Sequence, residues 1–177
     1  MLRPPRLIGW IGSLAVTLLL VMTLARVGTY FAFVHGRVPL SQSGAAFWLG
    51  LRFDVRIVAS AMLPLLLLGG ISFLDVFGST FGRRFWLTLL GVFTALLFLF
   101  YVCDFLHYRY LNQRLNASVL GYLHDAKISG GMVWQSYPVV RLLLGIAVAL
   151  AGFIWLAGFL HRRAAAGPTT PDRKSVV

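Results

Sequence analysis

Four long apolar stretches, separated by short polar segments, dominate the pattern of this 177-residue chain. A helix rises about 1.5 Å per residue, so about 20 apolar residues cross the ~30 Å hydrocarbon core of a bilayer. Each stretch reaches or nearly reaches that length with at most one charge inside it. The pattern therefore predicts an all-α, polytopic membrane protein with four transmembrane helices, at about residues 7–34, 57–74, 85–102 and 139–160.

The polar segment between the third and fourth stretches carries a pattern of its own. Between Ser118 and Ile128, apolar residues recur at roughly helical spacing against polar ones, and Gly130-Gly131 follows. This arrangement is typical of a short amphipathic helix that lies in the membrane interface and is stopped by glycine. We expect such an interfacial helix here.

The last ten residues, 168–177, are polar and unlike the rest of the chain. The final six, DRKSVV, resemble one reading frame of a widely used short-read sequencing adapter whose next codon is a stop. We therefore expect the transmembrane domain to occupy residues 1–167 and the natural protein to continue past about Gly167. An ordinary basic tail is the alternative.

Composition supports the membrane class and excludes others. Apolar residues make up 59% of the chain and charged ones 12%, against about a quarter charged in soluble domains. The net charge of +11 comes largely from arginines at the helix ends rather than on one basic face, so nucleic acid is not expected as a partner. With one cysteine, no internal disulfide can form, and Cys/His metal spacings are absent.

Three segments resemble the membrane domain of the lipoteichoic-acid-synthase-like family, a branch of the alkaline phosphatase and sulfatase superfamily. They are GLRFDVRIVASAMLPLLLL (Gly50 to Leu68), DFLHYRYLNQRLNASVLGYLHDA (Asp104 to Ala126) and GMVWQSYPVV (Gly131 to Val140). The resemblance implies five membrane helices, a cytoplasmic N-terminus and a large catalytic domain outside the membrane. In that domain a Thr nucleophile works with a divalent metal, Mn or Mg.

None of the family's catalytic motifs occurs in this chain, so the resemblance assigns it no catalytic residue, metal ligand or cofactor. The expected function is that of a membrane anchor of a phosphoglycerol transferase or sulfatase-like enzyme, in the bacterial cytoplasmic (inner) membrane. The chain alone is not expected to turn over substrate. Its expected partners are membrane lipids, anionic phospholipid headgroups among them, and the missing C-terminal catalytic domain.

The alternative is a complete small four-helix membrane protein, such as a transporter subunit or a respiratory haem anchor. A haem absorbance band in the purified protein would favour it. His107 and His124 are the histidines to consider as haem or metal ligands, but neither has a second histidine three or four residues away. Interfacial packing is the better interpretation of both.

The family orientation brings most of the membrane-level charges to the outer surface, where two roles are predicted for them. A surplus of cations there can hold lipid phosphate, because arginine makes bidentate contacts to phosphate. Snorkelling that merely fixes topology is the simpler alternative. The candidates for lipid headgroups are Arg52, Arg56, Arg109 and Arg141. The candidates for structural ion pairs are Arg26, Asp54 and Asp104.

The orientation itself rests on the resemblance. Lys and Arg are distributed so evenly between the two sides that the positive-inside rule does not distinguish the two orientations. An even helix count, combined with the family's cytoplasmic N-terminus, predicts that both ends of this chain lie in the cytoplasm.

Overall fold

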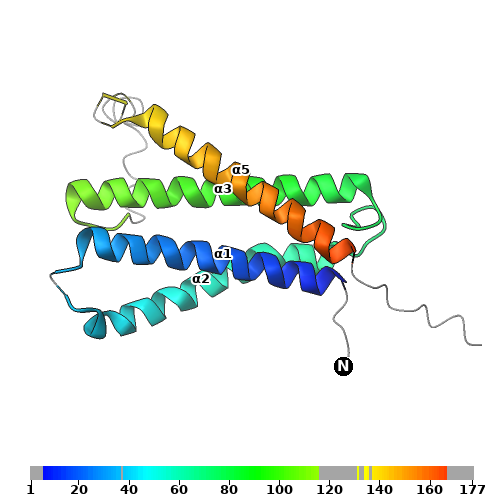
Figure 1. The fold of residues 1–177 in the computed structure, drawn as a ribbon, viewed down its shortest axis with the longest axis horizontal. Coiled ribbons are helices and arrows are strands. Elements are labelled where there is room, and N and C mark those ends of the chain that lie inside the picture. Colours follow the sequence, from blue (N-terminus) through cyan, green and yellow to red (C-terminus); the bar gives the residue numbers. More distant parts are fainter. Residues whose placement is uncertain (1–5, 37, 116–130, 132–133, 136, 167–177) are drawn as a thin grey trace, which may run out of the picture. The chain divides into compact units, whose positions relative to one another are not determined.

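A computed structural model describes residues 6–36, 38–115, 131, 134–135 and 137–166. In these residues it has four long helices and no strand: α1 (Arg6–Phe33), α2 (Leu40–Leu68), α3 (Thr80–Leu111) and α5 (Val139–Ala165) (Figure 1). Helices α1, α3 and α5 are long and apolar enough to cross a membrane. The all-helical, multi-pass class is therefore confirmed. The predicted interfacial helix at 118–128 and the tail at 168–177 lie outside the described residues.

Helix α2 departs most from its predicted range of 57–74. It begins at Leu40, after Pro39 in an extended conformation, and so includes three charged residues that the prediction placed before the helix: Arg52, Asp54 and Arg56. The residues from Leu40 to Arg56, which the prediction left outside any helix, are thus helical. Only the twelve residues from Ile57 to Leu68 follow the last charge. Because of these charges, α2 is not among the helices whose length and apolar composition suffice to cross a membrane. Composition therefore supports three crossings and does not establish the predicted fourth one.

The C-terminal end of α2 was also wrongly predicted. The helix ends at Leu68, and Gly69 caps it by donating its N–H to the Leu65 carbonyl at 2.9 Å. The apolar residues beyond it form turns instead of helix. The Val76 N–H donates to the Gly69 carbonyl at 3.2 Å, and the Trp86 indole N–H donates to the Leu74 carbonyl at 2.9 Å. The helix thus ends at two successive glycines, which disfavour helix, where hydropathy alone continued it.

The other helices extend as far as the predictions or further. Helix α1 agrees within one residue at each end, and Gly36, with a φ of 94°, lies just beyond it. Helix α3 reaches from Thr80 to Leu111 rather than 85–102, and Asn112 follows it in the left-handed conformation with a φ of 53°. Helix α5 begins at Val139, as predicted, but ends at Ala165. Polar residues at helix ends can stay helical because they reach water or headgroups.

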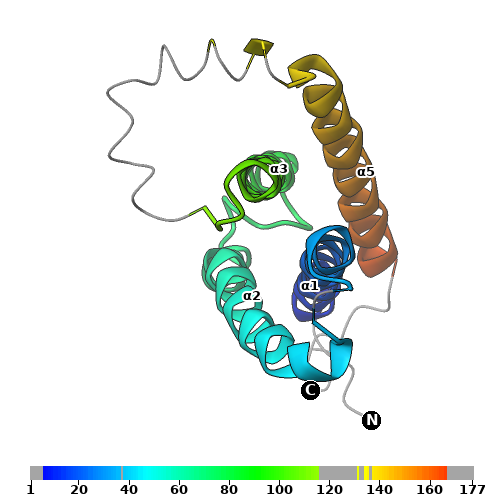
Figure 2. The ribbon, with the colours of Figure 1, turned by 90° about the vertical axis from the view of Figure 1, so that its left-hand side faces the viewer.

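The chain divides into two units. The first comprises residues up to Leu90 together with those from Ile154 onward, and the second runs from Gly91 to Phe153. In the first unit α1 and α2 lie side by side (Figure 2). The side chains buried in this unit are mostly large and apolar, and they include Trp10, Leu14, Leu18, Met22, Val58, Met62, Leu65 and Trp86.

Gly82 lies against backbone atoms of the turn that precedes α3. A Cβ atom there would lie 2.5 Å from the Asp75 carbonyl oxygen and 2.6 Å from the Leu74 carbonyl carbon. Since these are backbone atoms, they cannot rotate away. We expect Gly82→Ala to lower the free energy of unfolding by about 1–3 kcal/mol, measured in detergent micelles by circular dichroism.

Gly12→Ala is the matched control, because no atom lies within 4 Å of the position of its Cβ. It should be neutral or stabilise helix α1 by up to about 1 kcal/mol. Equal effects of the two substitutions would show that the turn does not pack against Gly82.

Candidate functional site

The strongest polar contact in the first unit joins α1 to α2. Arg26 Nη2 donates to Asp54 Oδ2 at 2.6 Å, and the two side chains are only 19% and 5% exposed. Gly50, one turn before Asp54, makes room for the guanidinium. A Cβ atom at that position would lie 2.3 Å from Arg26 Cζ. The sequence placed Arg26 and Asp54 among its ion-pair candidates, and the structure brings these two together.

The remaining cations of this part of α2 point elsewhere. Arg52 and Arg56 are exposed. Residues two apart on a helix point about 200° apart, so Asp54, between them, lies on the opposite side of α2. The guanidinium carbon of Arg56 lies 5.5 Å from the centre of the Phe53 ring. Among the described residues, neither arginine has a carboxylate partner.

The second unit holds the third ion-pair candidate. Asp104 accepts a hydrogen bond from Arg114 and another from the Leu115 backbone N–H at 2.9 Å. Arg114 also lies over the Tyr108 ring, 5.8 Å from its centre. Asp104 therefore holds the segment around Arg114 and Leu115, just after α3, against the end of that helix. The sequence offered no signal for this partner, because the ten-residue separation spans the end of the helix.

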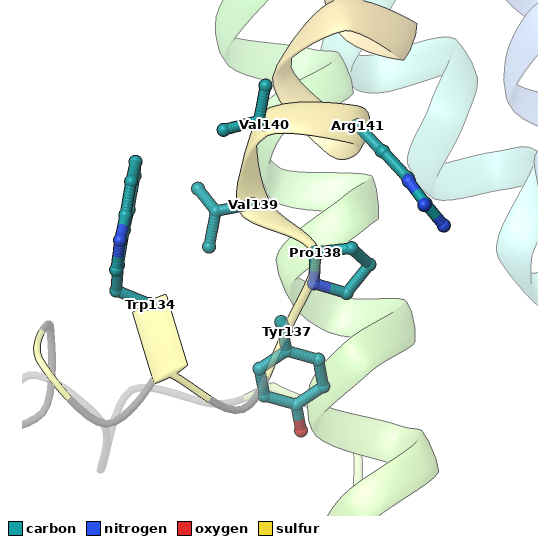
Figure 3. Close-up of a pocket in the computed structure, with 6 residues that line it drawn as sticks. All are labelled: Trp134, Tyr137, Pro138, Val139, Val140 and Arg141. Atoms are coloured by element: carbon teal, nitrogen blue, oxygen red, sulfur yellow. The ribbon is translucent and has the colours of Figure 1, made fainter.

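The two remaining headgroup candidates, Arg109 and Arg141, are both exposed. Arg141 lines a hollow of about 400 Å³ at the start of α5, whose other lining residues are Trp134, Tyr137, Pro138, Val139 and Val140. Figure 3 shows Trp134 on one side of Pro138 and Arg141 on the other, so their polar atoms do not converge on one point. This hollow is an open surface with one cation rather than a site closed around a ligand.

A second polar contact layer of the first unit was missed by sequence reasoning. The Trp10 indole N–H donates to the Ala157 carbonyl at 3.3 Å, and His161 Nε2 donates to the Val76 carbonyl at 3.0 Å. The His161 ring stacks on Phe77 with centres 4.9 Å apart and meets the Trp10 ring edge-on at 5.5 Å. These contacts hold the end of α5 to the start of α1 and to the turn after α2.

The two layers of contacts lie at similar distances along α1 and α2. Trp10 and Arg26 are sixteen residues apart on α1, which corresponds to about 24 Å. On α2, Asp54 and the Gly69 cap are fifteen residues apart, or about 22 Å. The residues between the layers are mostly apolar.

Metal chemistry finds no support in the described part of the chain, where no group of three or more His, Cys, Asp or Glu side chains is placed to hold an ion. His161 is already bonded to a carbonyl oxygen, and His107 is half-buried on α3. No protein-family model, curated protein or solved structure matches this chain.

Proposed function

We propose that this chain is the membrane-anchor domain of a lipoteichoic-acid-synthase-like enzyme, a phosphoglycerol transferase or sulfatase relative that acts outside the bacterial cytoplasmic membrane. The proposal is carried by the segment Gly50 to Leu68, one of the three that resemble the family. Asp54 of this segment pairs with Arg26, and Gly50 leaves room for the Arg26 guanidinium, so both residues have a structural role in the packing of α2 on α1. A divalent metal, Mn or Mg, belongs to the catalytic domain of the family and not to this chain.

In this proposal α2 is the fourth membrane crossing. Its charges do not prevent this, because Asp54 is neutralised by Arg26 and the two exposed arginines can extend to the headgroups. Its apolar part, Ile57 to Leu68, is about 18 Å long, and the turn that follows it packs on Trp10 through Phe77. If α2 lay flat on the membrane surface, these contacts with α1 at both ends of the helix could not form together.

The proposed topology predicts where introduced cysteines react. In a Cys103→Ser background, Gln113→Cys should be labelled by an impermeant maleimide in intact spheroplasts. Ser72→Cys, in the turn after α2, should be labelled only after lysis, because that turn faces the cytoplasm. Both native side chains are exposed, so neither substitution disturbs the core. Labelling of Ser72→Cys but not of Gln113→Cys in intact cells would contradict the orientation.

The family assignment itself is tested at the level of DNA. Genomic sequence read past the codon for Gly167 should continue in frame into a fifth apolar helix and then a sulfatase-type domain. A stop codon at that position in genomic DNA would instead support a complete four-helix membrane protein.

A further inference from the structure

We propose that Arg52 and Arg56 act together as a binding site for the phosphate of an anionic phospholipid. The site lies on the exposed face of α2, and the inference rests on the proposed membrane position of that helix. Among the four arginines that the sequence offered for headgroups, these two share one face of a single helix.

The face that carries the two arginines also carries a tryptophan. Trp48, Arg52 and Arg56 follow one another at intervals of four, so they form a stripe along one side of the helix. All three are exposed, and Trp48 is 64% exposed. Tryptophan is enriched at the headgroup level of bilayers, where its ring is apolar and its N–H is wet. Trp48 therefore fixes this stripe at the depth of lipid headgroups.

The positive charges on this face are not balanced. Arginines four residues apart are neighbours on a helix, and like charges at this spacing repel each other. The one carboxylate in the same two turns, Asp54, is 3% exposed and is bonded to Arg26 on the opposite face. The repulsion is therefore not relieved within the described part of α2. A single phosphate between the two guanidinium groups would relieve it.

One of the two guanidinium groups is also partly preorganised. Arg56 already lies over the Phe53 ring, which restricts its side chain without using any of its N–H donors. Each planar guanidinium can bind phosphate oxygens bidentately, and arginines four residues apart are near enough to reach one phosphate. A choline or other cationic ligand would be repelled by the same pair. The chemistry thus selects a lipid with an anionic phosphate.

The test is a binding titration on the purified full chain in an uncharged detergent. Phosphatidic acid with a fluorescent acyl chain serves as the probe, and fluorescence anisotropy reports its binding. The expected result is that Arg52→Gln with Arg56→Gln weakens binding about tenfold or more. Each single substitution should raise the logarithm of the dissociation constant by more than half as much as the double substitution does. The reason is that the phosphate is held by both arginines together, so removing either one loses most of the binding.

The matched control is Arg83→Gln with Arg84→Gln at the start of α3. This pair is also exposed and removes the same charge, but adjacent residues on a helix do not face each other and cannot share one phosphate in this way. It should change binding less than twofold. Equal weakening by the two double variants would overturn the site in favour of diffuse attraction to a basic protein.

Three competitors identify the source of the phosphate. Unlabelled phosphatidic acid should displace the probe, whereas equal amounts of phosphatidylcholine or of glycerol 3-phosphate should not. Displacement by glycerol 3-phosphate as effective as by phosphatidic acid would overturn the lipid site in favour of a soluble phosphate ligand. Unchanged binding by the Arg52/Arg56 variant, in protein whose cysteines label with the proposed topology, would remove this site and leave the anchor proposal standing.

Discussion

Replacing Arg26 with glutamine is expected to cause a large loss of stability, because it leaves the Asp54 carboxylate buried without its partner. The Asp54 side chain is only 5% exposed, so water cannot take the place of the guanidinium. Removing one member of a buried ion pair costs about 3–5 kcal/mol. The free energy of unfolding, measured by SDS titration of the protein in mixed micelles, should fall by this amount.

Two further variants separate the ion pair from a general effect of charge. Arg26→Gln combined with Asp54→Asn removes both charges and should recover most of the loss, since two neutral amides can bond to each other. Arg52→Gln, on the exposed face of the neighbouring helix, should change stability by less than about 1 kcal/mol. If Arg26→Gln and Arg52→Gln were equally mild, α1 and α2 would not be joined by this contact.

Replacing Trp10 with alanine should destabilise the protein to a similar degree, for a different reason. Trp10 is fully buried, edge-on to the stacked rings of Phe77 and His161, and its indole N–H bonds to the Ala157 carbonyl. Loss of such a buried aromatic side chain leaves a cavity and typically costs about 3–5 kcal/mol. Thermal unfolding followed by near-ultraviolet circular dichroism, which reports on packed aromatic rings, is the appropriate measurement.

Trp155→Ala supplies the comparison, because Trp155 lies on α5 two residues before Ala157 but is 66% exposed. Its loss should cost less than about 1 kcal/mol. Trp10→Phe keeps one aromatic ring but loses the pyrrole part of the indole and its hydrogen bond, so it should cost about 1–3 kcal/mol, less than Trp10→Ala. A Trp10→Ala protein that unfolds like Trp155→Ala would show that the end of α5 is not held to α1.

The sequence predicted a helix well where the residues of the helix are also the residues of the apolar stretch. Helix α1 is an apolar run interrupted only by Arg26 and agrees within one residue, and α5 begins where the fourth apolar stretch begins. Helix α2 was mispredicted because hydropathy reports which side chains avoid water, whereas a helix is made by backbone hydrogen bonds. Its charged turn stays helical since Asp54 has a partner and Arg52 and Arg56 face outward.

It was harder to predict which site residues pair with one another than to predict which residues belong to the site. Arg26 and Asp54 were both selected from their expected depth, but several arginines shared that depth, and only the packing of α1 on α2 chooses among them. The contact of Trp10 with His161 joins residues 151 positions apart, and neither residue has a local pattern that reveals it. Such long-range pairs depend on how helices pack, which the periodicity of one segment does not contain.

The positions of Arg6 and Arg26 also have a consequence for the bilayer. All residues between them are uncharged, and the twenty steps from one to the other correspond to about 30 Å of helix, the hydrocarbon thickness of a typical membrane. In the proposed arrangement, α1 therefore fits a bilayer of ordinary thickness without hydrophobic mismatch. A bilayer thinner by several Å would instead make the helix tilt, at a cost of a fraction of a kcal/mol per Å.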